Sequence, residues 1–312
     1  MALATQLGLP SFTKPAMQAL ARGPHVGRQK RLPHPIPYQG SKRNLAPQIL
    51  TLLRGRRFER LIEPFAGSAA ITIAAASQEL AQQYILNDSL QPLAALWQQM
   101  LTDPEQIAAE YRRLWQMQME ASQGYYTELR RQFNRSQNPV QLLYLLARCV
   151  KNAPRFNRDG AFNQSADKRR LGMHPDKMAQ EICGVAQLLA NRTTVHCADF
   201  AEILEQAVES DVVYLDPPYV GTSSGANRRY HQGLARVRLI DAIALLNRRG
   251  IPFLLSYDGR CGDKAYGPPL PDNLGLTRFD LIAGRSAQAT LNGRTEITVE
   301  SLYASAKLAA AG

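Results

Sequence analysis

An unusual stretch of the sequence, 211-DVVYLDPPY-219, joins an apolar run to an acid, two prolines and a tyrosine. Residues 212–215 are β-branched, aromatic or aliphatic, which predicts a buried strand. The two prolines lack backbone N–H donors and end that strand. They therefore hold Asp216 and Tyr219 in fixed directions beside a free carbonyl oxygen. An acid, an oxygen acceptor and an aromatic ring held together at the end of a strand are candidates for ligand binding.

Three other expected strands also end in residues suited to a ligand, which in open α/β sheets binds outside the carboxyl ends of the strands. After the first strand, Gly67 in 63-EPFAGSA-69 lets a ligand approach the backbone near the unpaired N–H groups of a helix. Asp88 ends the second strand, where an acid can bond ribose hydroxyls. Asp199 and Phe200 end the third, placed for an adenine amino group and ring. Both aspartates are equally well explained as helix N-caps.

Strand and helix patterns alternate on both sides of a different middle segment, which predicts a mainly parallel α/β sheet with an insertion. The first expected strand begins at residue 60. The others lie at 84–89, 193–200, 211–216 and 251–257, and a final antiparallel pair lies at 278–284 and 295–305. Helices are expected after Gly67 and at 91–103, 124–134, 139–150, 201–210 and 234–250.

The predicted organisation has four parts. Residues 1–34 form a basic, loosely ordered arm with a short helix near 16–22. Residues 35–101 are the first part of the catalytic domain, residues 102–184 an inserted domain that ends in a basic, polar loop, and residues 185–312 the second part.

The positive charge is concentrated near the amino terminus. The formal net charge is +11, and residues 1–60 hold eleven Lys and Arg residues against the single acid Glu59. A polyanion such as nucleic acid is one partner that this charge fits. A solvated basic tail is the alternative, and charge alone leaves the two open.

Other classes of protein are disfavoured. No apolar run approaches the length of a membrane span, and the start lacks the pattern of a secretory signal, so we expect a cytoplasmic protein. The four cysteines form no C-x-x-C pair and lack zinc-like spacing to histidine. We therefore expect free thiols and no metal.

The order of the motifs resembles that of the D12-class (Dam-like) N6-adenine-specific DNA methyltransferases. These motifs are 38-YQGSK-42, then 63-EPFAGSA-69, Asp88, an inserted domain and finally the Asp-Pro-Pro-Tyr tetrapeptide. The segments 125-YYTELRRQFN-134 and 155-RFNRDGAFN-163 are similar to parts of that family's target-recognition region, and the resemblance spans roughly residues 35–305. It implies a Rossmann-like S-adenosylmethionine-dependent methyltransferase sheet, with helices on both faces and a mostly helical target-recognition insertion.

The resemblance also implies a reaction. The family transfers a methyl group from S-adenosylmethionine to N6 of adenine in a short duplex DNA sequence, with the base flipped out. Asp216 and the Pro217 carbonyl would hold the amino group, Pro218 would stiffen the turn, and Tyr219 would stack on the base.

The family's cofactor and DNA sites can be carried over to matching positions. The predicted cofactor residues are Tyr38, Lys42, Glu63, Phe65, Gly67, Asp88, Asp199, Phe200 and Asp216. The predicted DNA-binding residues are Lys151, Arg155, Asn157, Arg158, Lys168, Arg169, Arg170 and Tyr230. For any single basic residue, a solvated surface charge is the alternative.

The chain departs from the family pattern at three places. Ala69 replaces a common second glycine, which is tolerable if its backbone is helical. The sequence 152-NAP-154 stands where an Asn-Gly pair is common, and loop 258–273 has no assigned role.

Alternative functions remain at this stage. They are N4-cytosine methylation, an RNA substrate, and a DNA-binding regulator with a relic methyltransferase fold. The expected partner is double-stranded DNA and the expected state a monomer; pairing with a restriction endonuclease and a housekeeping role are both open.

Overall fold

The computed structural model describes residues 31–121, 124–218, 235–261, 264–265, 269–285 and 297–309. Two predicted site residues, Tyr219 and Tyr230, lie outside these ranges. The short helix expected at 16–22 and most of the basic arm also lie outside them. Within the described part, no helix combines the length and the apolar character needed to cross a membrane.

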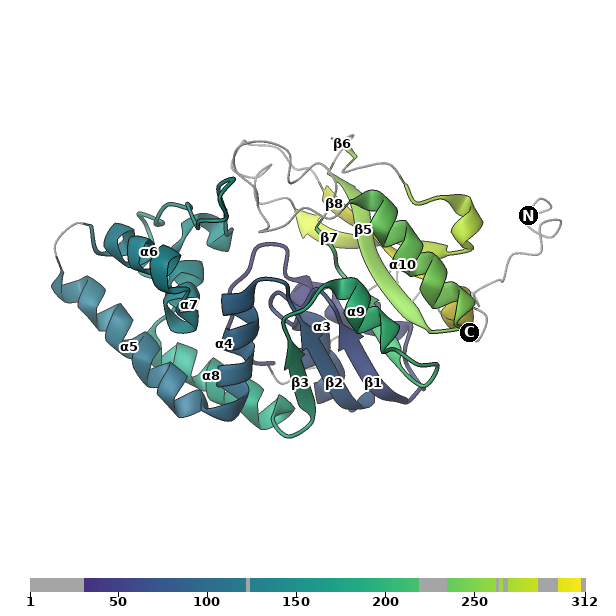
Figure 1. Cartoon of the computed structure of the whole chain (residues 1–312), viewed down its shortest axis with the longest axis horizontal. Coiled ribbons are helices and arrows are strands. Elements are labelled where there is room, and N and C mark those ends of the chain that lie inside the picture. The colour runs from purple at the N-terminus through teal and green to yellow at the C-terminus, as the bar shows by residue number, and fades with distance from the viewer. Residues whose placement is uncertain are drawn as a thin grey trace.

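The core of the molecule is a mixed sheet with the order β3-β2-β1-β4-β5-β8-β7, and β6 pairs with β5 (Figure 1). Pairing is parallel from β3 to β5, and β8 runs antiparallel to both β5 and β7. The strands are β1 (Phe58–Glu63), β2 (Ala81–Asn87), β3 (Thr193–His196), β4 (Val212–Leu215), β5 (Phe253–Cys261), β6 (Lys264–Ala265), β7 (Thr277–Arg285) and β8 (Ile297–Ala304).

This order confirms the predicted α/β sheet and its final antiparallel pair. The chain moves outward from β1 to β3 and then returns to the other side of β1 with β4 and β5. The topological switch point therefore lies between β1 and β4, where ligands of such sheets bind. Strand β3 is shorter than expected, because it ends at His196 and not at residue 200.

Both faces of the central strand are buried, because side chains alternate across it. Val212 and Tyr214 point into one apolar cluster, whereas Val213 and Leu215 point into the other. Helices α9 (Phe200–Glu205) and α10 (Arg236–Arg248) cover the second cluster, and Figure 1 shows them in front of the sheet. The first cluster is covered by α2 (Ala46–Thr51), α3 (Ala70–Ser77) and α4 (Gln91–Thr102).

The middle of the chain forms a helical body beside the sheet, on the left of Figure 1. Its elements are α5 (Pro104–Glu120), α6 (Tyr125–Ser136), α7 (Pro139–Arg148), the short η3 (Val150–Asn152) and α8 (Pro175–Leu189). Their buried residues belong to the same apolar cluster as α3 and α4. Helix α8 also runs through residue 184, where the insertion was expected to end. The division into domains stays a prediction.

Helices α5 and α8 were not anticipated, although α5 carries clear sequence signals. Asp103 caps its amino terminus by accepting a hydrogen bond from the N–H of Gln106, and Pro104 occupies the first helical position. Ile107, Tyr111 and Leu114 recur at helical spacing and are buried. Three short elements complete the fold: η2 (Lys42–Asn44), η4 (Asp272–Leu274) and α12 (Ala306–Ala309).

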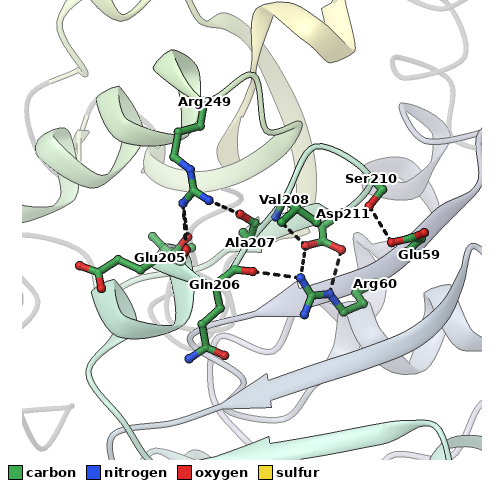
Figure 2. A network of polar contacts seen from close by, with 10 residues as sticks. Glu59, Arg60, Glu205, Gln206, Ala207, Val208, Ser210, Asp211 and Arg249 are labelled. Carbon is green, nitrogen blue, oxygen red and sulfur yellow. Dashed lines mark hydrogen bonds and ion pairs between the residues drawn. The ribbon is translucent and has the colours of Figure 1, made fainter.

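A polar network fixes the amino end of β4, at the edge of the sheet away from the strand ends discussed above (Figure 2). Arg60 on β1 donates two hydrogen bonds to the Asp211 carboxylate, from Nε at 2.9 Å and from Nη2 at 2.6 Å. Asp211 has no exposed surface and also accepts the N–H of Val208 at 2.8 Å. Nearby, Arg249 donates to carbonyl oxygens at the end of α9.

This network predicts a stability effect. Substituting Arg60→Met leaves the buried Asp211 carboxylate without its charge partner, so the free energy of unfolding should fall by about 3 kcal/mol. Urea denaturation monitored by circular dichroism measures the change. Arg54→Met is the control, because Arg54 is exposed on the surface before β1, and it should change stability by less than about 0.5 kcal/mol. Equal effects of the two substitutions would contradict the prediction.

Candidate active site

A buried ion pair lies at the carboxyl end of β4. Lys42, at the start of η2, is only 6% exposed, and its Nζ lies 2.9 and 2.8 Å from the two carboxylate oxygens of Asp216. The same ammonium lies 3.1 Å from the carbonyl oxygen of Gly40 and 3.3 Å from the Glu300 carboxylate on β8. Three segments far apart in the sequence therefore meet at one charge. Both members of the pair were predicted site residues, but Glu300 was not.

The environment of Asp216 tunes its protonation. Burial raises the pKa of this carboxyl to about 6; the ammonium of Lys42 opposes the rise and the charge of Glu300 adds to it. At neutral pH the carboxylate is therefore mostly ionised and can accept hydrogen bonds. Pro217 follows and is buried, and Pro218 is half-buried. The Lys42 ammonium thus holds the carboxylate beside a turn of two prolines, and the catalytic role of this motif stays a prediction.

Glu63 ends β1 and turns toward helix α3. One of its carboxylate oxygens accepts hydrogen bonds from the N–H of Thr72 at 3.0 Å and from its hydroxyl at 2.6 Å. Burial raises the Glu63 pKa to about 8, against the opposing effect of the Thr72 bonds, and the charge of Asp216 adds to the rise. The carboxyl therefore anchors the first turn of α3. Its predicted contact with the cofactor stays a prediction.

The turn between β1 and α3 has a backbone open to a ligand. Gly67 has φ +48°, and a Cβ placed there would meet nothing within 4 Å. Its N–H donates to one carboxylate oxygen of Asp88 at 3.0 Å, and its carbonyl accepts the indole N–H of Trp97 at 2.9 Å. The other oxygen of Asp88 accepts the N–H of Leu90 at 3.0 Å. Backbone groups thus fix the direction of the acid expected to bind ribose.

Ala69 was expected to be tolerable if its backbone is helical, and the structure does not meet that condition. Its backbone is left-handed, with φ 48° and ψ 35°, and it precedes the first residue of α3. A side chain in this conformation costs roughly 1–2 kcal/mol. Position 69 therefore favours the glycine that the family commonly has there.

The predicted adenine site has a partner that the sequence did not suggest. Asp199 accepts the N–H of Ala201 at 3.0 Å, which is the N-cap alternative, and also binds Arg238 of α10 at 2.7 Å. The Arg238 guanidinium lies 5.2 Å from the ring centre of Phe200, which is only 5% exposed. Phe65 packs on Phe200 with ring centres 5.2 Å apart. Stacking of adenine on Phe200 therefore requires Arg238 to move.

The loop at the start of the site connects to the helical body. Tyr38 is half-buried, and its carbonyl accepts the N–H of Ser41 at 3.2 Å. The hydroxyl of Ser41 bonds that of Ser68 at 2.8 Å. The N–H of Gln39 donates to the carbonyl of Asn152 at 2.9 Å. Residues 38–42 therefore touch both the β1–α3 turn and the loop that carries the predicted DNA-binding residues.

Residues 155–163 form a small hairpin. Phe156 and Phe162 face each other across it and are both buried, with ring centres 5.6 Å apart. The Asn157 side-chain oxygen accepts the N–H of Ala161 at 2.8 Å and closes the turn. Arg155 and Arg158 are exposed, as base-reading or phosphate-binding side chains would be.

The other predicted DNA-binding residues differ in their exposure and in the contacts of their side chains. Lys151, Lys168 and Arg169 are exposed. Arg170 is held in place, because its Nε lies 2.8 Å from the Asp167 carboxylate and its Nη1 lies 3.3 Å from the side-chain oxygen of Asn152. We therefore expect Arg170 to shape this loop, in addition to any contact with DNA.

Sequence reasoning also missed Asn87, which precedes Asp88. Its amide nitrogen donates to the carbonyls of Pro64 and Ala198, at 2.9 and 3.1 Å, and its oxygen accepts the N–H of Ala198 at 2.9 Å. Asn87 thereby ties together the carboxyl ends of β1, β2 and β3. A buried amide beside an acid at a strand end was the available signal.

The geometry suits S-adenosylmethionine. Gly67 leaves open space at a strand end, acids lie at the ends of β2, β3 and β4, and the rings of Phe65 and Phe200 lie nearby. No group of three His, Cys, Asp or Glu side chains that could hold a metal ion is found in the described part of the chain.

Comparison with known proteins identifies the family. The model of the D12 class N6 adenine-specific DNA methyltransferases matches residues 38–273. The chain belongs to this family. It is an enzyme that methylates N6 of adenine in DNA and uses S-adenosylmethionine, so the cytosine, RNA and relic-regulator alternatives are not supported.

Individual relatives agree with the family. A type II methyltransferase of Lactococcus lactis subsp. cremoris is 27% identical over 233 residues, which cover 70% of this chain and 78% of that protein. A DNA adenine methylase of Vibrio cholerae is 26% identical over 232 residues, covering 71% and 79%. The DNA adenine methylase of retron Ec67 of Escherichia coli is 33% identical over 172 residues, covering 53% and 57%.

The buried Glu63 predicts a pH dependence of stability. The folded enzyme keeps this proton up to about pH 8, whereas the group titrates near 4.5 in an unfolded chain. The folded state therefore binds more protons in between, and the free energy of unfolding should fall as pH rises, by up to ~1.4 kcal/mol per pH unit. Urea unfolding of wild type and Glu63→Gln between about pH 6 and about pH 8 tests this, because Asp216, whose pKa is about 6, is present in both proteins and the difference between their pH curves reports Glu63. Parallel pH curves for the two proteins would contradict it.

Proposed function

We propose that Asp216 and the Pro217 carbonyl hold the amino group of an adenine that has been flipped out of duplex DNA. The N6 lone pair is delocalised into the ring, so the amine is a poor nucleophile. Two acceptors on its hydrogens favour a tetrahedral nitrogen and direct the lone pair toward the methyl donor. The observation that supports this role is the stiffly held, ionised Asp216 carboxylate at the switch point of the sheet.

The cofactor supplies an activated methyl group when bound, and the protein orients the amine and accepts its proton. Nitrogen becomes cationic as the methyl is transferred, so its proton is released afterwards and needs no strong base beforehand. Asp216 is then the nearest acceptor in this proposal. Pro218 restrains the turn, and Tyr219 would stack on the flipped base.

For the cofactor, we propose that Tyr38 and Lys42 contact the methionine end. Glu63, Phe65 and Gly67 line the same part of the site, and Asp88 binds the ribose hydroxyls. The strand-end placement of Gly67 and Asp88 supports this assignment. The adenine moiety would lie near Asp199 and Phe200, with Arg238 displaced or repositioned against it.

For DNA, we propose that the hairpin at residues 155–163 and the neighbouring loop contact one short target sequence. Arg155 and Arg158 are exposed on a hairpin whose two phenylalanines are buried. The remaining proposed contacts are Lys151, Asn157, Lys168, Arg169, Arg170 and Tyr230. Arginine reads guanine or binds phosphate with the same rigid fork of donors.

We further propose a monomer that acts in the cytoplasm. One relative is named a type II methyltransferase, and by similarity this chain would protect DNA against a partner restriction endonuclease. A housekeeping role is the alternative, and a cognate nuclease activity against unmethylated DNA would distinguish them.

Asp216→Ala tests the proposed catalytic role. Wild type should place label from S-adenosylmethionine in N6-methyladenine within one short repeated context of unmethylated DNA, as nucleoside analysis and modified-base sequencing would show. The variant should lose at least about 100-fold of the rate while it keeps its fold and DNA binding. The control, Asp241→Ala on the exposed side of α10, should be fully active. Full activity of Asp216→Ala would exclude the role.

The hairpin makes a separate prediction. The double variant Arg155→Ala/Arg158→Ala should weaken DNA binding and reduce the slope of log Kd against log salt by roughly 1 for each DNA phosphate that the variant no longer neutralises. Fluorescence anisotropy with duplex DNA at several salt concentrations measures both effects. Arg248→Ala is the control, because Arg248 is an exposed arginine in the last turn of α10, outside the two segments that resemble the target-recognition region. A hairpin variant that binds like this control would show that the two arginines do not meet DNA.

A further inference from the structure

Glu300 is a charged residue of β8 that no motif accounts for. Its carboxylate lies 3.3 Å from the Lys42 ammonium, which also binds Asp216. The ammonium has three N–H donors, and its acceptors include the Asp216 carboxylate, the Gly40 carbonyl and Glu300. The charge of Lys42 is therefore shared between two acids.

A β-bulge sets the backbone that carries Glu300. The pairing of β5 and β8 shifts register between Ser256 and Gly259, and Gly259 pairs with Glu300. Gly259 has φ +135°, and a Cβ there would lie 2.7 Å from the Val299 carbonyl oxygen and 3.3 Å from Cα of Glu300. Only glycine permits this approach, so the Asp-Gly pair at the start of loop 258–273 brings β8 close at this point.

The charges that surround Asp216 come from three elements. Lys42 of η2 binds it, Glu300 of β8 repels it through space, and Glu63 of β1 lies near enough for the two carboxyls to affect each other. A lysine that binds one acid alone neutralises the charge of that acid more completely. The second acid, Glu300, therefore makes Asp216 a stronger hydrogen-bond acceptor.

We propose that Glu300 is a positioning residue for methyl transfer: it shares the Lys42 ammonium with Asp216 and thereby leaves Asp216 with capacity to accept the adenine amino hydrogen. The inference rests on the proposed role of Asp216. In this arrangement Glu300 keeps Lys42 in place while an oxygen of Asp216 accepts a hydrogen bond from the substrate. The repulsion between the two acids also makes Asp216 a better acceptor than a carboxylate paired with lysine alone.

Glu300→Gln removes the second negative charge and keeps the size of the side chain. Asp216 then interacts with Lys42 without the charge of Glu300, so its pKa should fall. The acid limb of the pH–rate profile, where the rate drops because Asp216 becomes protonated, should therefore move about 1 pH unit lower. The rate on the plateau should fall on the order of tenfold, because the carboxylate becomes a weaker acceptor.

The measurement is the single-turnover rate of methyl transfer from labelled S-adenosylmethionine to unmethylated plasmid DNA, between about pH 5 and about pH 9. Asp280→Asn is the matched control. It removes one charge from the same β7–β8 pair, but Asp280 binds Arg278 and Arg260 and is not a partner of Lys42. Its profile should superimpose on that of wild type.

Two further variants separate geometry from folding. Glu300→Asp keeps the charge and should restore the wild-type acid limb. Gly259→Ala keeps Glu300 but forces β8 away, so it should lower the acid limb as Glu300→Gln does. Thermal melting reports the fold of every variant, and a purely structural role for Glu300 would lower Tm without moving the acid limb.

The outcomes distinguish this inference from the proposed function. If Asp216→Ala remains active, the role of Asp216 fails and this inference fails with it. If Asp216→Ala is inactive while Glu300→Gln, folded, shows the wild-type acid limb, only the role of Glu300 is overturned. An acid limb that moves down in Glu300→Gln and returns in Glu300→Asp supports it.

Discussion

The buried ion pair between Lys42 and Asp216 is the interaction around which the site is built. An unpaired buried charge is far more costly than a paired one, so each side chain stabilises the other in its place. The pair joins the loop before α2 to the end of β4, 174 residues later in the chain, and Glu300 adds β8. Correct assembly of the sheet and assembly of the catalytic centre are therefore the same event.

Backbone groups fix most of the other acids at the strand ends. Asp88 is held by the N–H groups of Gly67 and Leu90, Glu63 by the first turn of α3, and Asp199 by the first turn of α9. Backbone donors keep their positions better than long side chains do, because they lose no rotamer entropy. The site is thus stiff before any ligand binds, which suits a reaction that gains its rate from positioning.

The two ends of strand β4 carry different charge arrangements. At the amino end of β4, Arg60 and Asp211 form a compact charge pair close to the loop that ends α9 (Figure 2). At the carboxyl end, the Lys42 ammonium binds the carboxylates of both Asp216 and Glu300. The helical body joins this second edge through its common apolar cluster and through the bond between Gln39 and Asn152. Residues 38–42 and the loop that holds Asn152 are therefore joined by a backbone hydrogen bond.

Sequence by itself determined the alternation of strands and helices, the final antiparallel pair and the family, because these follow from local periodicity, turn chemistry and motif order. The roles predicted for Asp216, Lys42 and Gly67 stay predictions. Sequence did not determine the left-handed backbone at Ala69, since nothing local forces it. The sequence did not indicate the contacts of Glu300 and Arg238 either. Their partners lie far away in the sequence, and only the register of β8, shifted by the bulge at Gly259, and the packing of α10 on α9 decide what they touch.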